Sequence, residues 1–191
     1  MTKSVTGILL AAGQSTRFGS DKLLHPLENG TPMAVVTARH LKGVLERSIA
    51  VVADIESELA GLLAGEGLRI VPNPRAGKGM GTSIACGVAA SPEAAGWLIA
   101  LADMPRIPGT IIQAVVASLE GGADIVAPVY QGRRGHPVGF SARHAPALMQ
   151  LQADTGARGI IAANRGSLEM IETMDAGVIA DIDSTASLMN L

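Results

Sequence analysis

Short apolar runs alternate with longer amphipathic segments along the first 130 residues, and this alternation constrains the fold more than any other feature. The apolar runs predict strands over residues 6–12, 48–54, 68–72, 97–103 and 124–130. All but the last are apolar on both faces, which is typical of parallel strands covered by helices on each side. The intervening segments have helical spacing, over residues 32–46, 55–65, 80–91 and 108–121. We therefore predict an α/β fold with a doubly wound, mostly parallel sheet and right-handed crossovers.

The pattern changes after residue 130. Residues 131–135 predict a turn, and residues 136–140 predict a strand that returns antiparallel. Without a linker, repeat or low-complexity segment, we expect a single domain over residues 1–191, in which the part after 130 forms the far wall of a ligand site. The other elements expected there are helices at 142–150 and 156–164, strands at 168–174 and 177–183, and a last helix from Ser184.

Composition excludes several classes of protein. Hydrophobic residues make up 48% of the chain and aromatic residues only 2%, so the core must be aliphatic. A net charge of −2 argues against a nucleic-acid-binding face, and the one cysteine, Cys86, excludes an intrachain disulfide and a multi-cysteine metal site. The first six residues are too short and polar for a signal peptide, and no apolar run approaches the roughly 20 residues of a membrane span. We expect a cytoplasmic protein that binds neither nucleic acid nor membrane.

The loop after the first predicted strand combines glycines with cations. Ligands of open α/β sheets bind beyond the carboxyl ends of the strands, where this loop lies. Gly13 and Gly19 permit close backbone approach, while Arg17 and Lys22 supply a guanidinium fork and a mobile point charge for phosphate. The loop therefore predicts a polyphosphate cradle, with a merely solvated surface loop as the alternative. Neither the Walker motif nor the dinucleotide G-x-G-x-x-G motif is present in it.

Carboxylates end two of the predicted strands. Asp103 follows the buried run WLIALA, on the same edge of the sheet as the opening loop. A carboxylate among phosphates needs a bridging cation, and Mg²⁺ takes one or two carboxylates together with phosphate oxygens. Asp181 and Asp183 follow the run GVIA and point to one face if the run is a strand, so one of them could complete the metal site. The alternative for Asp103 and for Asp183 is the N-cap of a following helix.

The residues of the opening loop also carry a family resemblance. The stretch LAAGQSTRFGSDK, residues 10–22, resembles the L-A-(A/G)-G-x-S-x-R-(F/M)-G-x-x-K signature of nucleotidyltransferases. Its closest likeness is to the cytidylyltransferases of molybdenum cofactor synthesis, relatives of the corresponding guanylyltransferases. Relatives usually continue the last motif as D-x-D-T-P-E-D, whereas this chain has DIDSTAS, so the resemblance favours Asp181 over Asp183. Further motifs match in order over residues 73–88, 101–105, 135–140, 154–159 and 181–183.

The resemblance implies roles for individual residues. It implies catalytic roles for Arg17, Lys22 and Asp103, and a Mg²⁺ ion held by Asp103 and Asp181. It also implies that the glycine-rich loop entering the helix at 80–91 contacts the nucleotide, with a flexible loop and an ordinary N-cap as the alternative. The nucleotide-binding residues expected on this basis are Leu10, Ala11, Ala12, Gly13, Arg17, Lys22, Gly79, Gly81, Ser83 and Asp103.

The acceptor side of the site rests on fewer residues. His136 and Arg158 are candidates for binding a second anionic substrate, whereas a structural hydrogen bond for His136 and an ion pair between Arg158 and Asp154 are the alternatives.

The resemblance implies transfer of CMP from CTP to the phosphate of molybdopterin or of the molybdenum cofactor, with release of pyrophosphate. LAAG stands where guanylyltransferases tend to carry LAGG, which favours CTP. A molybdoenzyme or its chaperone would be the protein partner. The alternatives are transfer from GTP to the molybdenum cofactor, transfer to a sugar or polyol phosphate, a non-catalytic nucleotide-binding or chaperone module, and a dinucleotide-dependent oxidoreductase.

Overall fold

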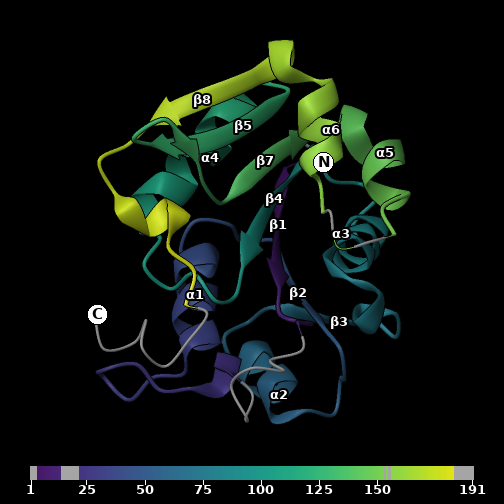
Figure 1. Cartoon of the computed structure of the whole chain (residues 1–191). Helices are drawn as coiled ribbons and strands as arrows, with labels where there is room; N and C mark the ends of the chain where they lie inside the picture. The colour runs from purple at the N-terminus through teal and green to yellow at the C-terminus, as the bar shows by residue number, and fades with distance from the viewer. Residues whose placement is uncertain (1–3, 14–21, 153, 155, 183–191) are drawn as a thin grey trace.

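The described residues build one mixed sheet. The structure is a computed structural model that describes residues 4–13, 22–152, 154 and 156–182. Within that part of the chain, the sheet has eight strands in the order β3-β2-β1-β4-β7-β5-β6, and β8 also pairs with β5. The expected α/β class with a mostly parallel sheet and an antiparallel addition is confirmed (Figure 1).

The first four strands form the parallel part of this sheet. They are β1 (Val5–Leu10), β2 (Ser48–Val52), β3 (Arg69–Pro72) and β4 (Gly96–Leu101). β1 pairs in parallel with both β2 and β4, and β2 pairs in parallel with β3. Every residue of β1 and β2 is buried, because apolar side chains on both faces of these strands pack under helices.

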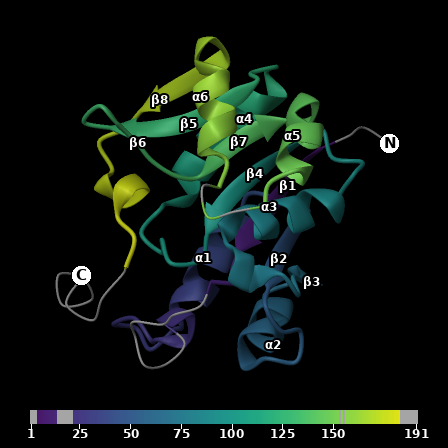
Figure 2. The same ribbon diagram turned by 45° about the vertical axis from the view of Figure 1, so that its right-hand side comes forward.

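Two aliphatic cores lie on opposite faces of the sheet. Along β1, Leu9 packs into one core, while Ile8 and Leu10 pack into the other, as the two-residue period of a strand requires. The first core lies under α1 (Met33–Lys42), α2 (Glu58–Gly65) and α4 (Gly109–Glu120). The second lies under α3 (Met80–Ala89), α5 (Ala145–Met149) and α6 (Arg158–Ala163), and Figures 1 and 2 show the two groups on opposite sides of the strands.

The second core contains Trp97, which is 1% exposed near the start of β4. Its indole Nε1–H donates a hydrogen bond of 2.9 Å to Ser91 Oγ. The one tryptophan of the chain is therefore held rigidly, with its polar atom satisfied.

The later strands depart from simple alternation. β7 (Val138–Ser141) runs antiparallel between β4 and β5 (Ile125–Tyr130), so the strand predicted at 124–130 exists but does not neighbour β4. β8 (Leu168–Glu172) pairs in parallel with β5. The antiparallel return predicted at 136–140 is confirmed, and the predicted turn at 131–135 contains the two-residue strand β6 (Arg133–Arg134).

The strand predicted over 177–183 is wrong for the described residues. Residues Ala176–Ile179 form the 3₁₀-helix η5 instead, and the Asp175 carboxylate accepts a hydrogen bond of 2.8 Å from the Gly177 N–H at its start. The apolar side chain of Val178 is buried by this turn rather than by a sheet. The helix predicted from Ser184 lies outside the described residues. No helix of the described part is long and apolar enough to cross a membrane.

A charged cluster fastens the start of β5 to the end of β7. Asp124 accepts a hydrogen bond of 2.7 Å from Ser141 Oγ, and its carboxylate lies 3.2 Å from His144 Nε2 and 3.4 Å from an Arg143 guanidinium nitrogen. Burial alone would raise the pKa of Asp124. The hydrogen bond from Ser141 and the charges of His144 and Arg143 outweigh burial, so the pKa is lowered.

This cluster gives a pH-dependent contribution to stability. Because the pKa of Asp124 is lower in the folded protein, its contribution is present above the unfolded pKa of about 4 and is lost as pH falls through the folded pKa. We expect Asp124→Asn to lower the free energy of unfolding by about 1 kcal/mol at pH 7. The difference from wild type should shrink at pH 3, measured by urea unfolding at both values. The exposed substitution Glu93→Gln is the control, and a difference for Asp124→Asn that is the same at both pH values would contradict the assignment.

Candidate functional site

The carboxyl edge of the parallel strands collects most of the predicted site residues. Ala11 and Ala12 continue β1 and are buried, and the Ala11 N–H donates to the Val51 carbonyl at 2.9 Å. The Leu10 carbonyl accepts a hydrogen bond of 3.2 Å from the Ala102 N–H, so β1 and β4 end together. Gly13, which follows, is exposed. The expected site residue Arg17, and Gly19, lie outside the described residues.

Two of the predicted catalytic residues are in direct contact. Lys22 Nζ lies 2.8 Å from Asp103 Oδ2, and the two side chains are only 14% and 23% exposed. Lys22 begins the 3₁₀-helix η1 (Lys22–Leu24), and Asp103 follows β4. The buried Thr37 of α1 donates from Oγ1 to the Ala102 carbonyl at 3.2 Å, which fixes the peptide just before Asp103. The sequence predicted both residues at one edge of the sheet, but it gave no sign that they pair.

The segment after η5 brings Asp181 to the same place. The Ile182 N–H donates a hydrogen bond of 3.1 Å to the Asp103 carbonyl, so the exposed Asp181 stands next to Asp103. The segment docks because the Val178 carbonyl accepts a hydrogen bond of 2.8 Å from the His136 N–H. Gly135 makes this contact possible, since a Cβ there would lie 2.2 Å from the Val178 oxygen. Asp183 lies outside the described residues.

The carboxylates at this edge suit a divalent cation. Asp103 already has a positive group, the Lys22 amine, 2.8 Å from one carboxylate oxygen. No group of three or more His, Cys, Asp or Glu side chains in the described part could hold a metal ion by itself. Asp103 and Asp181 supply carboxylate oxygens, and a hard divalent cation such as Mg²⁺ commonly takes one or two of these and completes its shell with phosphate oxygens and water. The residues present therefore fit a metal that arrives with a phosphorylated substrate.

The glycine-rich loop forms a second wall, and a buried amide organises it. Asn73 is 2% exposed, and its Nδ2 donates to Thr82 Oγ1 at 2.9 Å and to Ser83 Oγ at 3.0 Å. Its Oδ1 accepts from the Arg75 N–H at 3.0 Å. These bonds tie the end of β3 to the first turns of α3. Sequence reasoning did not single out Asn73, although a polar residue directly after a strand was the available signal.

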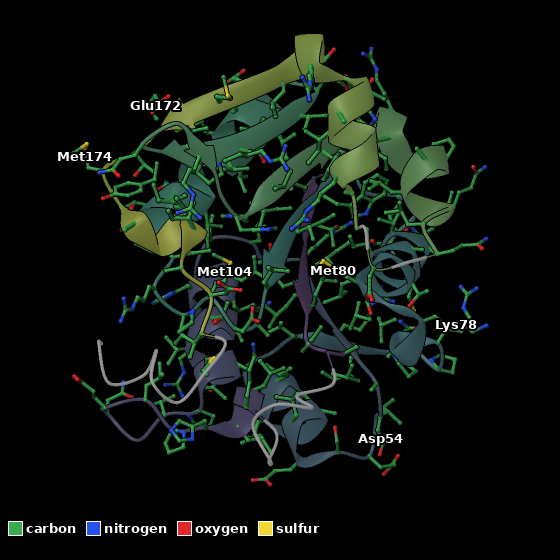
Figure 3. All side chains as sticks on the ribbon, in the orientation of Figure 1. Asp54, Lys78, Met80, Met104, Glu172 and Met174 are labelled. Atoms are coloured by element: carbon green, nitrogen blue, oxygen red, sulfur yellow. The ribbon has the colours of Figure 1, made fainter. Side chains whose placement is uncertain are left out.

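Three predicted nucleotide-binding residues lie at this wall. Gly79 precedes α3 with a φ of +111°, a backbone conformation that residues other than glycine rarely adopt. Gly81 and Ser83 are buried in the first turns of α3, where the Ser83 hydroxyl accepts the hydrogen bond from Asn73. Met80, labelled in Figure 3, lies between them in the chain, and its sulfur is next to Gly156. The loop before α6 therefore borders the start of α3.

His136 lies close enough to Asp103 for the charge of that carboxylate to act on it. It is joined to Pro137 by a cis peptide bond, and its Nδ1 is buried with no hydrogen-bond partner among the described residues. Burial lowers the pKa of His136 to about 4; the charge of Asp103 opposes this shift, and the charges of Arg134 and Arg158 add to it. The imidazole is therefore neutral near pH 7, with one carboxylate and two guanidinium groups close enough to act on it.

Arg158 is exposed at the start of α6. The ion pairs found within the described residues do not include one between Arg158 and Asp154, which was the alternative considered for this arginine.

Comparison with known families decides the classification. Residues 7–169 match the model of the MobA-like NTP transferase domain, and this range holds both walls of the site. The chain belongs to this family.

Relatives of this MobA-like protein differ in their named roles. It is 29% identical to the nicotine blue oxidoreductase of Paenarthrobacter nicotinovorans, over 98% of this chain and 96% of the relative. It is 30% identical to the purine catabolism protein PucB of Bacillus subtilis, over 93% of this chain and 91% of the relative. It is 29% identical to the molybdenum cofactor cytidylyltransferase of Escherichia coli, over 93% of this chain and 90% of the relative.

Solved structures share the fold. Rv0371c of Mycobacterium tuberculosis superimposes with a TM-score of 0.84 at 22% identity, covering 100% of this chain and 98% of the other. A complex of Rv0371c with manganese superimposes with a TM-score of 0.79 at 22% identity, covering 99% and 98%. The MobA-like chain therefore has the nucleotidyltransferase fold of its family.

The Asn73 network predicts a local loss of order when it is removed. We expect Asn73→Ala to lower the free energy of unfolding by about 2 kcal/mol, because Thr82, Ser83 and the Arg75 N–H each lose a buried partner. Trypsin should then cut faster after Arg75 and Lys78, measured by mass spectrometry of limited digests. The matched control is Asn29→Ala, whose amide accepts only an exposed local bond from the Thr31 N–H. Equal cleavage rates in both variants would show that Asn73 does not organise this loop.

The close approach of Gly135 to the Val178 carbonyl holds the segment that carries Asp181, and a larger residue at 135 tests this. Gly135→Ala should displace the segment 176–182, because the new methyl group would overlap the Val178 carbonyl. We expect faster hydrogen exchange at the amides of His136 and Ile182, which lose their carbonyl partners. Gly159→Ala in α6 is the control, since nothing lies within 4 Å of a Cβ there. Unchanged protection of Ile182 in Gly135→Ala would mean that this contact does not hold the segment.

Proposed function

We propose that this protein transfers CMP from CTP to the phosphate of molybdopterin or of the molybdenum cofactor, with release of pyrophosphate. The observation that carries the proposal is the meeting of Lys22 and Asp103 at 2.8 Å, with Asp181 beside them, at the carboxyl edge of an NTP transferase sheet. The base is proposed from Ala12, which stands where guanylyltransferases tend to carry glycine. The similarity to the Escherichia coli cytidylyltransferase supports the same acceptor.

The proposed nucleotide subsite combines both walls. Arg17 and Lys22 offset the charge of the triphosphate, while the backbone of residues 10–13 and of Gly79 and Gly81 approaches the nucleotide. Ser83 contributes a hydroxyl at the same wall. Asp103 and Asp181 hold Mg²⁺, which when bound neutralises phosphate charge and orients the α-phosphate. The manganese complex of the structural relative Rv0371c supports a divalent metal in this fold.

The proposed chemistry needs little from acids and bases. An oxygen of the acceptor phosphate attacks the α-phosphorus, the bond from that phosphorus to the bridging oxygen breaks, and pyrophosphate leaves with the electron pair. The attacking phosphate is already an anion, so positioning and charge neutralisation supply most of the rate. The neutral His136 and the guanidinium of Arg158 are suited to hold that phosphate beside Asp103. His136 Nδ1 is buried and has no hydrogen-bond partner in the part of the chain that the structure describes, which supports a ligand-binding role.

Several alternative functions can be distinguished from this one by experiment. The named relatives include a purine catabolism protein and an oxidoreductase, so the acceptor could differ even within the family. GTP as donor, a sugar or polyol phosphate as acceptor, and a non-catalytic module that delivers the cofactor are the remaining alternatives. We propose a cytoplasmic location, with a molybdoenzyme or its chaperone as the recipient of the product.

A thermal-shift panel tests the choice of nucleotide. With Mg²⁺ present, CTP should raise the unfolding temperature more than GTP, ATP or UTP, because a ligand stabilises the native state according to its saturation. A larger shift with GTP would overturn the cytidylyl assignment. NADPH and NADH belong in the same panel, and a shift with either would favour the oxidoreductase alternative.

Pyrophosphate release tests the reaction and its residues. Wild-type protein with CTP, Mg²⁺ and molybdenum cofactor should release pyrophosphate, and Lys22→Ala and Asp103→Ala should each lower kcat by about 100-fold or more. Lys42→Ala is the control, because Lys42 donates to the Glu46 carbonyl away from the site. Wild-type turnover in both Lys22→Ala and Asp103→Ala would contradict the site, and saturable CTP binding without any release would favour the delivery module.

A further inference from the structure

We infer that Lys22 makes the site selective for the metal–nucleotide complex over the free metal ion. In the nucleotide-free protein the Lys22 amine holds the position on Asp103 that a metal would take, and it leaves only when a triphosphate offers it other oxygens. The inference rests on the proposed function for the identity of the nucleotide, but its metal-binding part depends only on the Lys22–Asp103 contact.

The geometry puts the lysine amine in competition with a metal for one oxygen of Asp103. Lys22 Nζ is 2.8 Å from Asp103 Oδ2. A Mg²⁺ ion binds a carboxylate oxygen at about 2.0–2.1 Å, so an ion that approached Oδ2 from the side of Lys22 would overlap the amine. The Lys22 amine and the metal ion are also both cationic. Their repulsion is strong here, because the side chains of Lys22 and Asp103 are mostly shielded from water.

The surroundings of Asp103 add to the barrier against a free cation. Lys22 is in contact with the carboxylate, and the charges of Arg134 and Arg158 act at His136, the same residue on which Asp103 acts. A free divalent ion therefore has to displace the Lys22 amine from the carboxylate without bringing negative charge of its own. A triphosphate brings negative charge with the metal, so the same displacement then gains phosphate contacts for the lysine.

The anchoring of Lys22 suits such an exchange. The next residue, Leu23, is 4% exposed and packs in the core that contains α1, so the backbone of η1 is fixed. The lysine side chain has four flexible methylene groups, which let the amine move while its Cα stays in place. Phosphate oxygens accept charge-assisted hydrogen bonds from an amine as a carboxylate does, so the exchange keeps the Lys22 charge paired.

Manganese titration of the nucleotide-free protein tests the inference. Free Mn²⁺ is followed by its EPR signal as wild type, Lys22→Met, Lys22→Arg and Lys42→Met are added. We expect Lys22→Met to bind Mn²⁺ at least about fivefold more tightly than wild type, because the carboxylate of Asp103 is released. Lys22→Arg, which keeps a cation, and Lys42→Met, the control, should stay as weak as wild type. The gain should vanish in the double variant Lys22→Met with Asp103→Asn.

Addition of CTP should reduce the advantage of Lys22→Met in Mn²⁺ binding. Wild type should bind Mn²⁺ more tightly with CTP than without it, whereas Lys22→Met should gain less, because it has no amine to give to the phosphates. Equal or weaker Mn²⁺ binding by nucleotide-free Lys22→Met, with urea unfolding like that of wild type, would overturn the inference. Lys22→Gln provides a second neutral variant if Lys22→Met does not fold, and the same two results count for it.

The two proposals fail separately in these experiments. Tighter Mn²⁺ binding by Lys22→Met without any pyrophosphate release by wild type would support the role of Lys22 and contradict the proposed reaction. Pyrophosphate release by wild type with unchanged Mn²⁺ binding in Lys22→Met would do the opposite. The titration uses neither acceptor nor turnover, so an unidentified acceptor does not affect it.

Discussion

Burial of the parallel strands on both faces is the constraint on which the rest of the structure depends. β1 and β2 have no exposed residue, and aliphatic cores cover them from each side. Charged groups cannot be placed along such strands without a large desolvation cost, so they gather where the strands end. β1 and β4 end in register, and the chain leaves them as the loop at Gly13 and as Asp103. The site is therefore a result of how the core is built.

The later part of the chain closes that edge from the other side. β7 inserts between β4 and β5 and brings the segment at His136 close to Asp103. The chain then passes through β8 and η5 and returns to Asp103 through the Ile182 N–H. Asp103 and Ile182, which are 79 positions apart in the sequence, thus meet through a backbone hydrogen bond, which holds position more firmly than contacts between long side chains would. In Figure 3, Met104, the neighbour of Asp103, and Met80, at the start of α3, are labelled on either side of β1 and β4 in that view.

Sequence patterns predicted the elements whose signal is local. The first four strands and the helices between them were predicted because their apolar residues follow a regular spacing over many positions. The place of β7 was not predictable from its own residues, since a strand of four residues carries no information about its neighbours. The run GVIA has the apolar composition of a buried strand, and the sequence alone therefore predicts one. A capped 3₁₀ turn that buries Val178 has the same composition, so the two cannot be told apart without the structure.

The site was predicted in the same uneven way. Lys22 and Asp103 were found from charge at strand ends, but their contact depends on η1 and could not be derived from spacing. Asn73 was missed because a buried, fully bonded amide looks like any loop asparagine in a sequence. Arg17 and Asp183 stay predictions, since both lie outside the described residues.

The buried indole of Trp97 has a practical consequence. Trp97 and Asp103 belong to opposite ends of β4, and six residues of strand correspond to about 20 Å. The tryptophan fluorescence of this chain, excited at wavelengths that tyrosine does not absorb, therefore comes from one rigid position far from where ligands would bind. A shift of this emission to long wavelength will report loss of the packed core, and it will respond little to ligand binding at the carboxyl edge of the sheet. Tryptophan fluorescence can therefore follow the unfolding of this protein with little interference from ligand binding.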